Sequence, residues 1–193
     1  MATTDTFLAD EKLQQIRDAA FDAFLLYGFK RTSMEDIAAQ AEMSRAALYL
    51  HFRNKRDIFR SVVEGIYDRG TVRFQAALNP SLPVAETVAE ALRAKDDGIW
   101  ERLLSSPHWS EFLGVGQEAA SDISRAGEAR LVEVLEHYFN AVLANRDVAA
   151  RTPPGELAGH IVEVNHALYK ISGPEPRRHV LLGQTAAALL GVD

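Results

Sequence analysis

A chain of 193 residues, of which 47% are hydrophobic and 25% charged, is long enough to bury a core and has the composition of an ordinary globular protein. The sequence contains no cysteine, which excludes disulfide frameworks, thiolate metal sites and thiol nucleophiles. The formal net charge of -6 would repel nucleic acid if it were spread evenly, so the distribution of the charge matters more than its sum.

The N-terminal residues, Met1 to Asp10, lack the basic segment and the apolar core of a secretory signal peptide. No apolar run in the sequence approaches the length that a transmembrane helix needs. These two features predict a cytoplasmic protein.

The first part of the chain predicts four helices in quick succession. Apolar residues recur at helical spacing over residues 13–27, and Gly28 ends this helix because glycine adopts the left-handed cap at little cost. Ser33, Ser44 and Asn54 are suitable N-caps for the helices that follow. We therefore expect helices at residues 13–27, 33–40, 44–52 and 55–78.

The remainder of the chain shows the same period. Glycine and proline mark the breaks, and no stretch alternates with a period of two for long enough to predict a strand. We expect helices at residues 84–104, 108–120, 121–145, 156–171 and 176–190, which makes about nine helices in an all-α protein. The expected organisation is an N-terminal three-helix head at residues 1–54 and a helical body at residues 55–193.

Residues 34–52 have apolar positions that fit two short helices joined by a tight turn, the pattern of a helix-turn-helix. The second helix of such a unit lies in the major groove, where small residues permit close approach and donors read base edges. Ala46 and Ala47 are small, and Arg45 is a donor. Flanking polar or basic side chains can bind phosphates, and the candidates for this role are Thr32, Ser33, Tyr49, His51 and Lys55.

The local charge agrees with a DNA-binding head. Residues 28–60 contain seven basic and four acidic residues, so a basic segment lies within an acidic protein. A plain helical hairpin with solvated basic residues would show the same spacing. Spacing and charge alone therefore leave both interpretations open.

A longer run of residues, from about Leu13 to Phe59, resembles the DNA-binding head of the TetR family of transcriptional regulators. The matching positions are Ile16 to Ala20, Phe24, Gly28, Phe29, Thr32 to Met34, Asp36 to Ala38, Ala41, Ser44, Arg45, Leu48, Tyr49, Phe52 and Lys55. The resemblance implies DNA contacts by Arg45, Ala47, Tyr49, His51 and Lys55, with Thr32 and Ser33 touching phosphate. Ser44 and Ala46 of the same helix complete the predicted set.

Three positions depart from the family's pattern. Glu42 stands where the family usually has glycine in the turn, and it requires either an unusual backbone angle or a tilted turn. Ala46 and Ala47 replace the glycine and threonine that are common in the recognition helix. The two methyl groups bear on the operator sequence, because they suit contact with thymine.

The resemblance also implies that the body binds a small, largely apolar or aromatic effector and forms a homodimer through its last two helices. The protein would then repress transcription by occupying a palindromic DNA operator. A ligand cavity is usually apolar with a few placed polar groups. The candidates are Trp100, Trp109, Phe112, Tyr138, Asn165, His166 and Tyr169, although we expect most of them simply to be core residues.

Other classes of protein receive less support from the sequence. No GxSxG, HExxH or P-loop motif is present, so we expect no enzyme activity and no cofactor. His160, Glu163 and His166 have a spacing that permits a metal site, but no further set of ligands accompanies them, and we expect no metal. A helical interaction protein whose head has lost DNA binding is the remaining alternative, with Glu42 as the first suspect.

Overall fold

The computed structural model describes residues 2–172 and 177–192, and it describes the side chains of residues 10–168 and 177–192. Over these residues the chain forms ten α-helices and no β-strand, which confirms the predicted all-α class. Two compact units make up the chain: Met1–Ile66 with Leu103–Ser124, and Tyr67–Arg102 with Arg125–Asp193. Within the described residues, no helix has both the length and the apolar character needed to cross a membrane.

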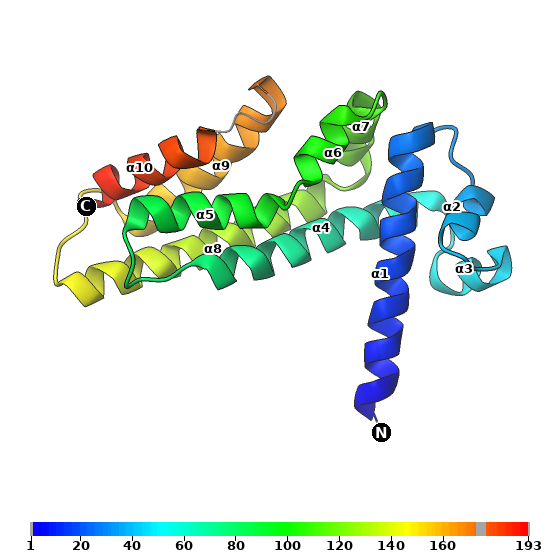
Figure 1. The fold of residues 1–193 in the computed structure, drawn as a ribbon, viewed down its shortest axis with the longest axis horizontal. Helices are drawn as coiled ribbons and strands as arrows, with labels where there is room; N and C mark the ends of the chain where they lie inside the picture. The colour runs from blue at the N-terminus through cyan, green and yellow to red at the C-terminus, as the bar shows by residue number, and fades with distance from the viewer. Residues whose placement is uncertain (1, 173–176, 193) are drawn as a thin grey trace. The chain divides into compact units, whose positions relative to one another are not determined.

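The first unit holds the predicted helix-turn-helix together with parts of later helices. It contains α1 (Ala2–Tyr27), α2 (Met34–Gln40), α3 (Arg45–His51), the start of α4 (Lys55–Ala77) and α7 (Trp109–Ala119). α2 packs against α1, and α3 packs against α2 (Figure 1).

Local hydrogen bonds fix the ends of these short helices. Ser33 and Asp36 form a capping box, in which Ser33 Oγ accepts from the Asp36 N–H at 3.1 Å and Asp36 Oδ2 accepts from the Ser33 N–H at 2.8 Å. Ser44 Oγ accepts from the Ala47 N–H at 3.1 Å and caps α3. Gly28 follows α1 with a φ of 80°. Both serine caps and the glycine stop agree with the sequence prediction.

Aromatic side chains form the centre of the first unit. Phe59 of α4 lies between Phe24, Phe29 and Phe112, with ring centroids 5.6, 5.5 and 4.8 Å away. Phe112 of α7 also meets Phe21 of α1 edge-on at 5.5 Å. Tilted and edge-on contacts at these distances are favourable for aromatic rings. α7 is therefore part of the core that supports the helix-turn-helix.

The second unit contains the rest of α4 and most of the C-terminal half of the chain. Its further helices are α5 (Val84–Asp96), α6 (Ile99–Ser105, whose end belongs to the first unit), α8 (Ser121–Arg146), α9 (Pro154–Ser172) and α10 (Arg178–Leu190). α10 packs along α5 and also contacts α9 (Figure 1). The lack of a side chain at Gly183 allows α5 and α10 to approach closely, since a Cβ at this position would overlap the carbonyl oxygen of Ala85.

The structure differs from the expected elements between residues 84 and 104. The single helix expected there is divided into α5 and α6, because Asp97 and Gly98 adopt left-handed backbone angles with φ of 43° and 72°. The chain therefore has ten helices over its described residues instead of about nine. The compact units also divide the chain elsewhere than between residues 54 and 55, because residues 55–66 and 103–124 pack with the head. The assignment of DNA binding to the head and ligand binding to the body remains a prediction.

Candidate DNA-binding interface

The turn between α2 and α3 sets the angle at which the two helices meet. The Ala38 carbonyl accepts from the Met43 N–H at 2.9 Å, and the Ala39 carbonyl accepts from the Glu42 N–H at 3.1 Å. Glu42 has a left-handed backbone with a φ of 52°, which is disfavoured for a residue that carries a Cβ. The turn thus keeps the conformation that glycine would adopt, and the acidic residue has not opened it.

α3 buries one side chain and presents most of the others to solvent. Leu48 is fully buried and holds the helix on the core. Leu50, which is absent from the predicted contact residues, is 86% exposed. The predicted contacts Ser44, Arg45, Ala46, Tyr49 and His51 are exposed, and Ala47 is half-buried. A short helix with an apolar anchor and a small, polar outer face has the form of a recognition helix.

Arg45 is held by two neighbours on this surface. One terminal nitrogen forms an ion pair with Glu35 of α2, and the other donates to the Tyr49 hydroxyl at 3.3 Å. The guanidinium also lies over the Tyr49 ring, 5.4 Å from its centroid. The hydrogen bond to Tyr49 and the charge of Glu35 raise the pKa of Arg45. The sequence alone marked Arg45 as a contact residue but not Glu35.

Lys55, a predicted phosphate contact, is bound by three carbonyl groups of its own chain. Its ammonium donates to the carbonyl oxygens of Phe29, Lys30 and Thr32 at 2.6, 2.9 and 2.8 Å. An ammonium has three donors, so all of them are used within the protein. Burial lowers the pKa of Lys55, and the nearby carboxylate of Glu111 opposes this shift. A phosphate contact by Lys55 would have to replace one of these bonds, and it stays a prediction.

Thr32, another predicted phosphate contact, is buried. Its side chain is 2% exposed, and its hydroxyl lies 2.7 Å from the Gly28 carbonyl oxygen and 3.2 Å from that of Ala23. A phosphate contact by this hydroxyl would require it to give up its bonds to the end of α1, and this contact stays a prediction. Ser33 is half-buried, and its hydroxyl donates to Asp36 at 2.7 Å, so a phosphate contact would have to replace this bond.

The loop between α1 and α2 is held from α7 and the residue before it. Glu111 Oε1 accepts from the Lys30 N–H at 2.7 Å, and Arg31 Nη2 lies 3.0 Å from His108 Nε2. The partners are 81 and 77 residues apart in the sequence. No local sequence pattern predicts contacts between residues so far apart, so these two contacts were not predicted.

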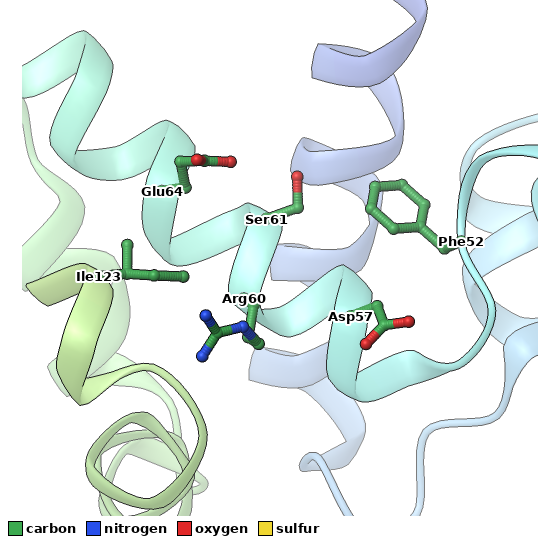
Figure 2. Close-up of a pocket in the computed structure, with 6 residues that line it drawn as sticks. All are labelled: Phe52, Asp57, Arg60, Ser61, Glu64 and Ile123. Atoms are coloured by element: carbon green, nitrogen blue, oxygen red, sulfur yellow. The ribbon is translucent and has the colours of Figure 1, made fainter.

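A polar hollow of about 350 Å³ lies beside the start of α4, and Figure 2 shows its lining. It is lined by Phe52, Asp57, Arg60, Ser61, Glu64 and Ile123. Arg60 pairs with Asp122 at 2.7 Å, Glu64 pairs with Arg17 at 3.1 Å, and Asp57 accepts from the Asn54 side chain at 3.2 Å. Its charged side chains already have protein partners, so the hollow is a packing feature of the first unit.

Two of the predicted pocket residues belong to the first unit. Phe112 packs on Phe21 and Phe59, which makes it a core residue of that unit, as we expected of most of these candidates. Trp109 begins α7 and is 39% exposed. The helical period showed which side chains point inward, but it could not show which of two cores they enter.

Three other pocket candidates come from α8 and α9. Tyr138 is buried and its ring lies 5.7 Å from that of Phe139, and burial raises the pKa of Tyr138. Asn165 is 3% exposed. The side chain of Tyr169 lies outside the described side chains.

Trp100 and His166 meet in the second unit. Their rings are edge-on at 6.5 Å, and His166 Nδ1 lies 2.9 Å from Glu128 Oε1. Tyr67 donates to the same carboxylate oxygen at 3.3 Å. Glu128 thus contacts the predicted pocket residue His166, and Tyr67 contacts Glu128. The sequence had not indicated either Glu128 or Tyr67. Across the described part of the chain, no group of three or more histidine, aspartate or glutamate residues could hold a metal ion.

The geometry of α2, the turn and α3 defines a helix-turn-helix protein. Residues 16–62 match the family model described as bacterial regulatory proteins, tetR family. The chain belongs to this family and is a transcriptional regulator.

Comparisons over most of the chain agree with this assignment. The transcriptional regulator AcrR of Shigella flexneri is 28% identical over 163 residues, which cover 79% of this chain and 76% of AcrR. A solved structure assigned to the TetR family, from Mesorhizobium loti, has a TM-score of 0.69 and 22% identity over 94% of each chain. SmeT, the repressor of a Stenotrophomonas maltophilia multidrug efflux pump, has a TM-score of 0.59 and 20% identity over 91% of this chain and 88% of its own. The two solved structures show the same fold, and the family and AcrR are transcriptional regulators, in agreement with the prediction that the chain is not an enzyme.

Proposed function

We propose that the protein is a ligand-responsive repressor that binds a palindromic operator as a homodimer. The observation that carries the proposal is the exposed face of α3, where Arg45, Ala46 and Tyr49 stand around the buried anchor Leu48. The major groove of B-DNA admits an α-helix, and a guanidinium can bond to guanine O6 and N7 at the same time. α3 thus combines a small outer surface with one strong base-reading group.

A homodimer would place two copies of α3 on one face of the duplex. The half-sites read by a two-fold dimer lie about one helical turn, roughly 34–36 Å, apart. The last two helices expose apolar side chains that a partner could cover, namely Val164 on α9 and Val180, Leu181 and Leu189 on α10. Symmetry would make this interface the same patch on both subunits.

The effector would bind in the second unit, near Trp100, Asn165 and His166. Asn165 is buried, and the rings of Trp100 and His166 form a mixed aromatic and polar surface. A complex of SmeT with triclosan has been solved, which supports a small aromatic effector for this chain. α4 would carry the signal, because residues 55–66 belong to the first unit and residues 67–77 to the second. A coupling of ~1–3 kcal/mol is typical of such a switch.

Sequencing of genomic DNA fragments retained by the purified protein tests the proposal. We expect enrichment of one palindromic sequence. Arg45→Ala should then cost about 1–3 kcal/mol on that sequence and little on random duplex. Arg53→Ala, which removes an exposed arginine just beyond α3, should weaken both duplexes alike because it removes charge without a base contact. Failure to enrich any sequence would contradict the proposal.

Release of the operator tests the effector. We expect a small aromatic compound, with triclosan as the first probe, to raise the melting temperature of the free protein and to dissociate the operator complex. A ligand stabilises the form of the protein that it binds by mass action. If it binds the DNA-free form more tightly than the DNA-bound form, it must by linkage weaken DNA binding. Binding of such a compound with no change in operator affinity would contradict the ligand-responsive part of the proposal.

A further inference from the structure

The ion pair between Glu35 and Arg45 joins the two helices of the helix-turn-helix on their exposed side. Glu35 lies in the first turn of α2 and Arg45 is the first residue of α3. Their side chains are 52% and 57% exposed, so neither group gains from burial. An exposed ion pair contributes little to stability, typically ~0–1 kcal/mol. The main effect of this ion pair is therefore on the orientation of the Arg45 side chain.

Two contacts fix the guanidinium from opposite ends. Glu35 binds Nη1, while Nη2 donates to the Tyr49 hydroxyl at 3.3 Å and the ring of Tyr49 lies beneath the group. Each terminal nitrogen of arginine carries two N–H groups. Each therefore keeps a second donor after these contacts. Two parallel donors on one guanidinium are what the O6 and N7 atoms of guanine require.

The charge of Glu35 also changes which part of DNA Arg45 prefers. A free arginine on a recognition helix is attracted to any phosphate, which adds affinity without sequence preference. A carboxylate beside the guanidinium cancels most of its net charge and repels phosphate, but it leaves the second N–H donor of each terminal nitrogen available to a base edge. The pair thus favours an uncharged acceptor edge over the backbone.

We propose that Glu35 is a positioning residue for base recognition, which holds Arg45 against Tyr49 so that the guanidinium reads guanine and does not bind phosphate. This inference rests on the proposed DNA-binding function and names a residue that determines its specificity. Glu35 itself need not touch the DNA.

The test begins with selection of the preferred site from a library of randomised duplexes by the intact wild-type protein. Binding constants are then measured on that site, on the same site with single guanine replacements, and on a scrambled duplex at two salt concentrations. We expect Glu35→Ala to reduce the preference for one guanine in each half-site by about tenfold. Affinity for the scrambled duplex should rise or stay the same, because a negative charge has been removed.

Two further variants separate positioning from a general change in charge or fold. Glu35→Gln keeps the size of the side chain, and we expect it to lose base preference in the same direction without loss of thermal stability. Glu11→Gln removes one exposed charge from α1 in the same unit and should leave base preference unchanged. In an Arg45→Ala background, Glu35→Ala should have no further effect on the preference for that guanine.

Several results would overturn the inference. Glu35→Ala and Glu35→Gln could both retain the wild-type base preference, or Glu35→Ala could still lower it when Arg45 is already alanine. Either outcome would show that Glu35 does not act through Arg45. If the wild-type protein selects no sequence at all, the proposed function fails as well, which distinguishes the two failures.

Discussion

Glu42 shows at the scale of one residue how an unfavourable position can be retained in a functional turn. A left-handed φ costs a residue with a Cβ about 1–2 kcal/mol, and glycine avoids this cost at the expense of unfolded-state entropy of about 0.5–1 kcal/mol. Glu42→Gly should therefore raise the free energy of unfolding by about 0.5–1 kcal/mol. Denaturant unfolding measures the change.

A control separates the backbone effect at this turn from the removal of its charge. Glu42→Ala removes the same carboxylate but keeps the Cβ, so we expect no comparable gain in stability. If alanine and glycine stabilise the protein equally, the φ of 52° at Glu42 is not the source of the effect.

Lys55 gives a second prediction at this scale. Its ammonium satisfies three carbonyl oxygens, and loss of hydrogen bonds from a charged donor typically costs about 1.5–3 kcal/mol. Lys55→Met keeps the aliphatic stem and removes the donors, and it should lower the free energy of unfolding by this amount. Arg53→Met, at an exposed position two residues earlier, should change it by less than about 0.5 kcal/mol. Equal effects of the two variants would count against a structural role for Lys55.

Contacts between residues close in the sequence were predictable, and contacts between distant residues were not. Ser33 and Ser44 cap their helices through partners only three residues away, so composition and spacing were sufficient to predict them. Lys55 reaches carbonyl groups 23 to 26 residues away. A basic residue after a recognition helix has the same appearance in sequence whether it binds phosphate or a neighbouring loop.

At the scale of elements, the start of α4 is joined to the start of α8 by a two-bonded ion pair. Arg60 donates from Nη1 and Nη2 to the two oxygens of Asp122 at 2.8 and 2.7 Å. The hydrogen bonds from Arg60 lower the pKa of Asp122 from 3.8 to about 2, together with backbone N–H groups at the start of the helix. A folded-state pKa below the unfolded value stabilises the protein above the unfolded pKa, and this contribution is lost as the pH falls through the folded pKa.

Asp122→Asn should therefore lower stability at pH 7, and the difference from wild type should shrink as the pH falls from about 4 towards about 2. Chemical denaturation at a series of pH values measures this difference. The stability of Arg60→Gln relative to wild type should depend on pH in the same way. The double variant should be no less stable than the less stable of the two single variants. A difference that stays constant from pH 7 to pH 2.5 would show that Asp122 acts by packing or capping alone.

Most helix boundaries lie within a few residues of those expected, although α1 begins at Ala2 and not near residue 13. The grouping of the helices was not predicted. Most breaks lie at glycine or proline, whose backbone preferences are local, and these were predicted. Gly98 was recognised as a break, but the expected helix at residues 84–104 was continued through it. The left-handed conformation of Asp97 was not predicted, because aspartate carries only a weak preference for it. Phe112 was named as a pocket candidate because it is an aromatic residue of the middle helices, yet its partners Phe21 and Phe59 come from the head and from the start of α4. Which core an apolar face enters is a property of the tertiary fold.

At the scale of the whole molecule, the exposed apolar side chains of α10 are candidates for burial in the proposed homodimer. Leu181 and Leu189 are 57% and 43% exposed, and residues four apart follow one face of a helix. The intervening residue of this face, Thr185, is exposed, and its hydroxyl donates to the Leu181 carbonyl at 2.8 Å. This stripe is the best described candidate for the centre of the homodimer interface.

Leu181→Glu should weaken the dimer at least tenfold, or by about 1.4 kcal/mol, because a two-fold interface contains the new charge twice. Val72→Glu is the matched control, since Val72 is 68% exposed on α4 in the same unit. Analytical ultracentrifugation over a range of concentrations should find the control dimeric like the wild type and the Leu181 variant dissociating. The variant should also lose affinity for a full operator while its binding to an isolated half-site is unchanged, because each head remains folded and only the link between the two is broken. A Leu181 variant that dimerises like wild type would move the interface away from α10.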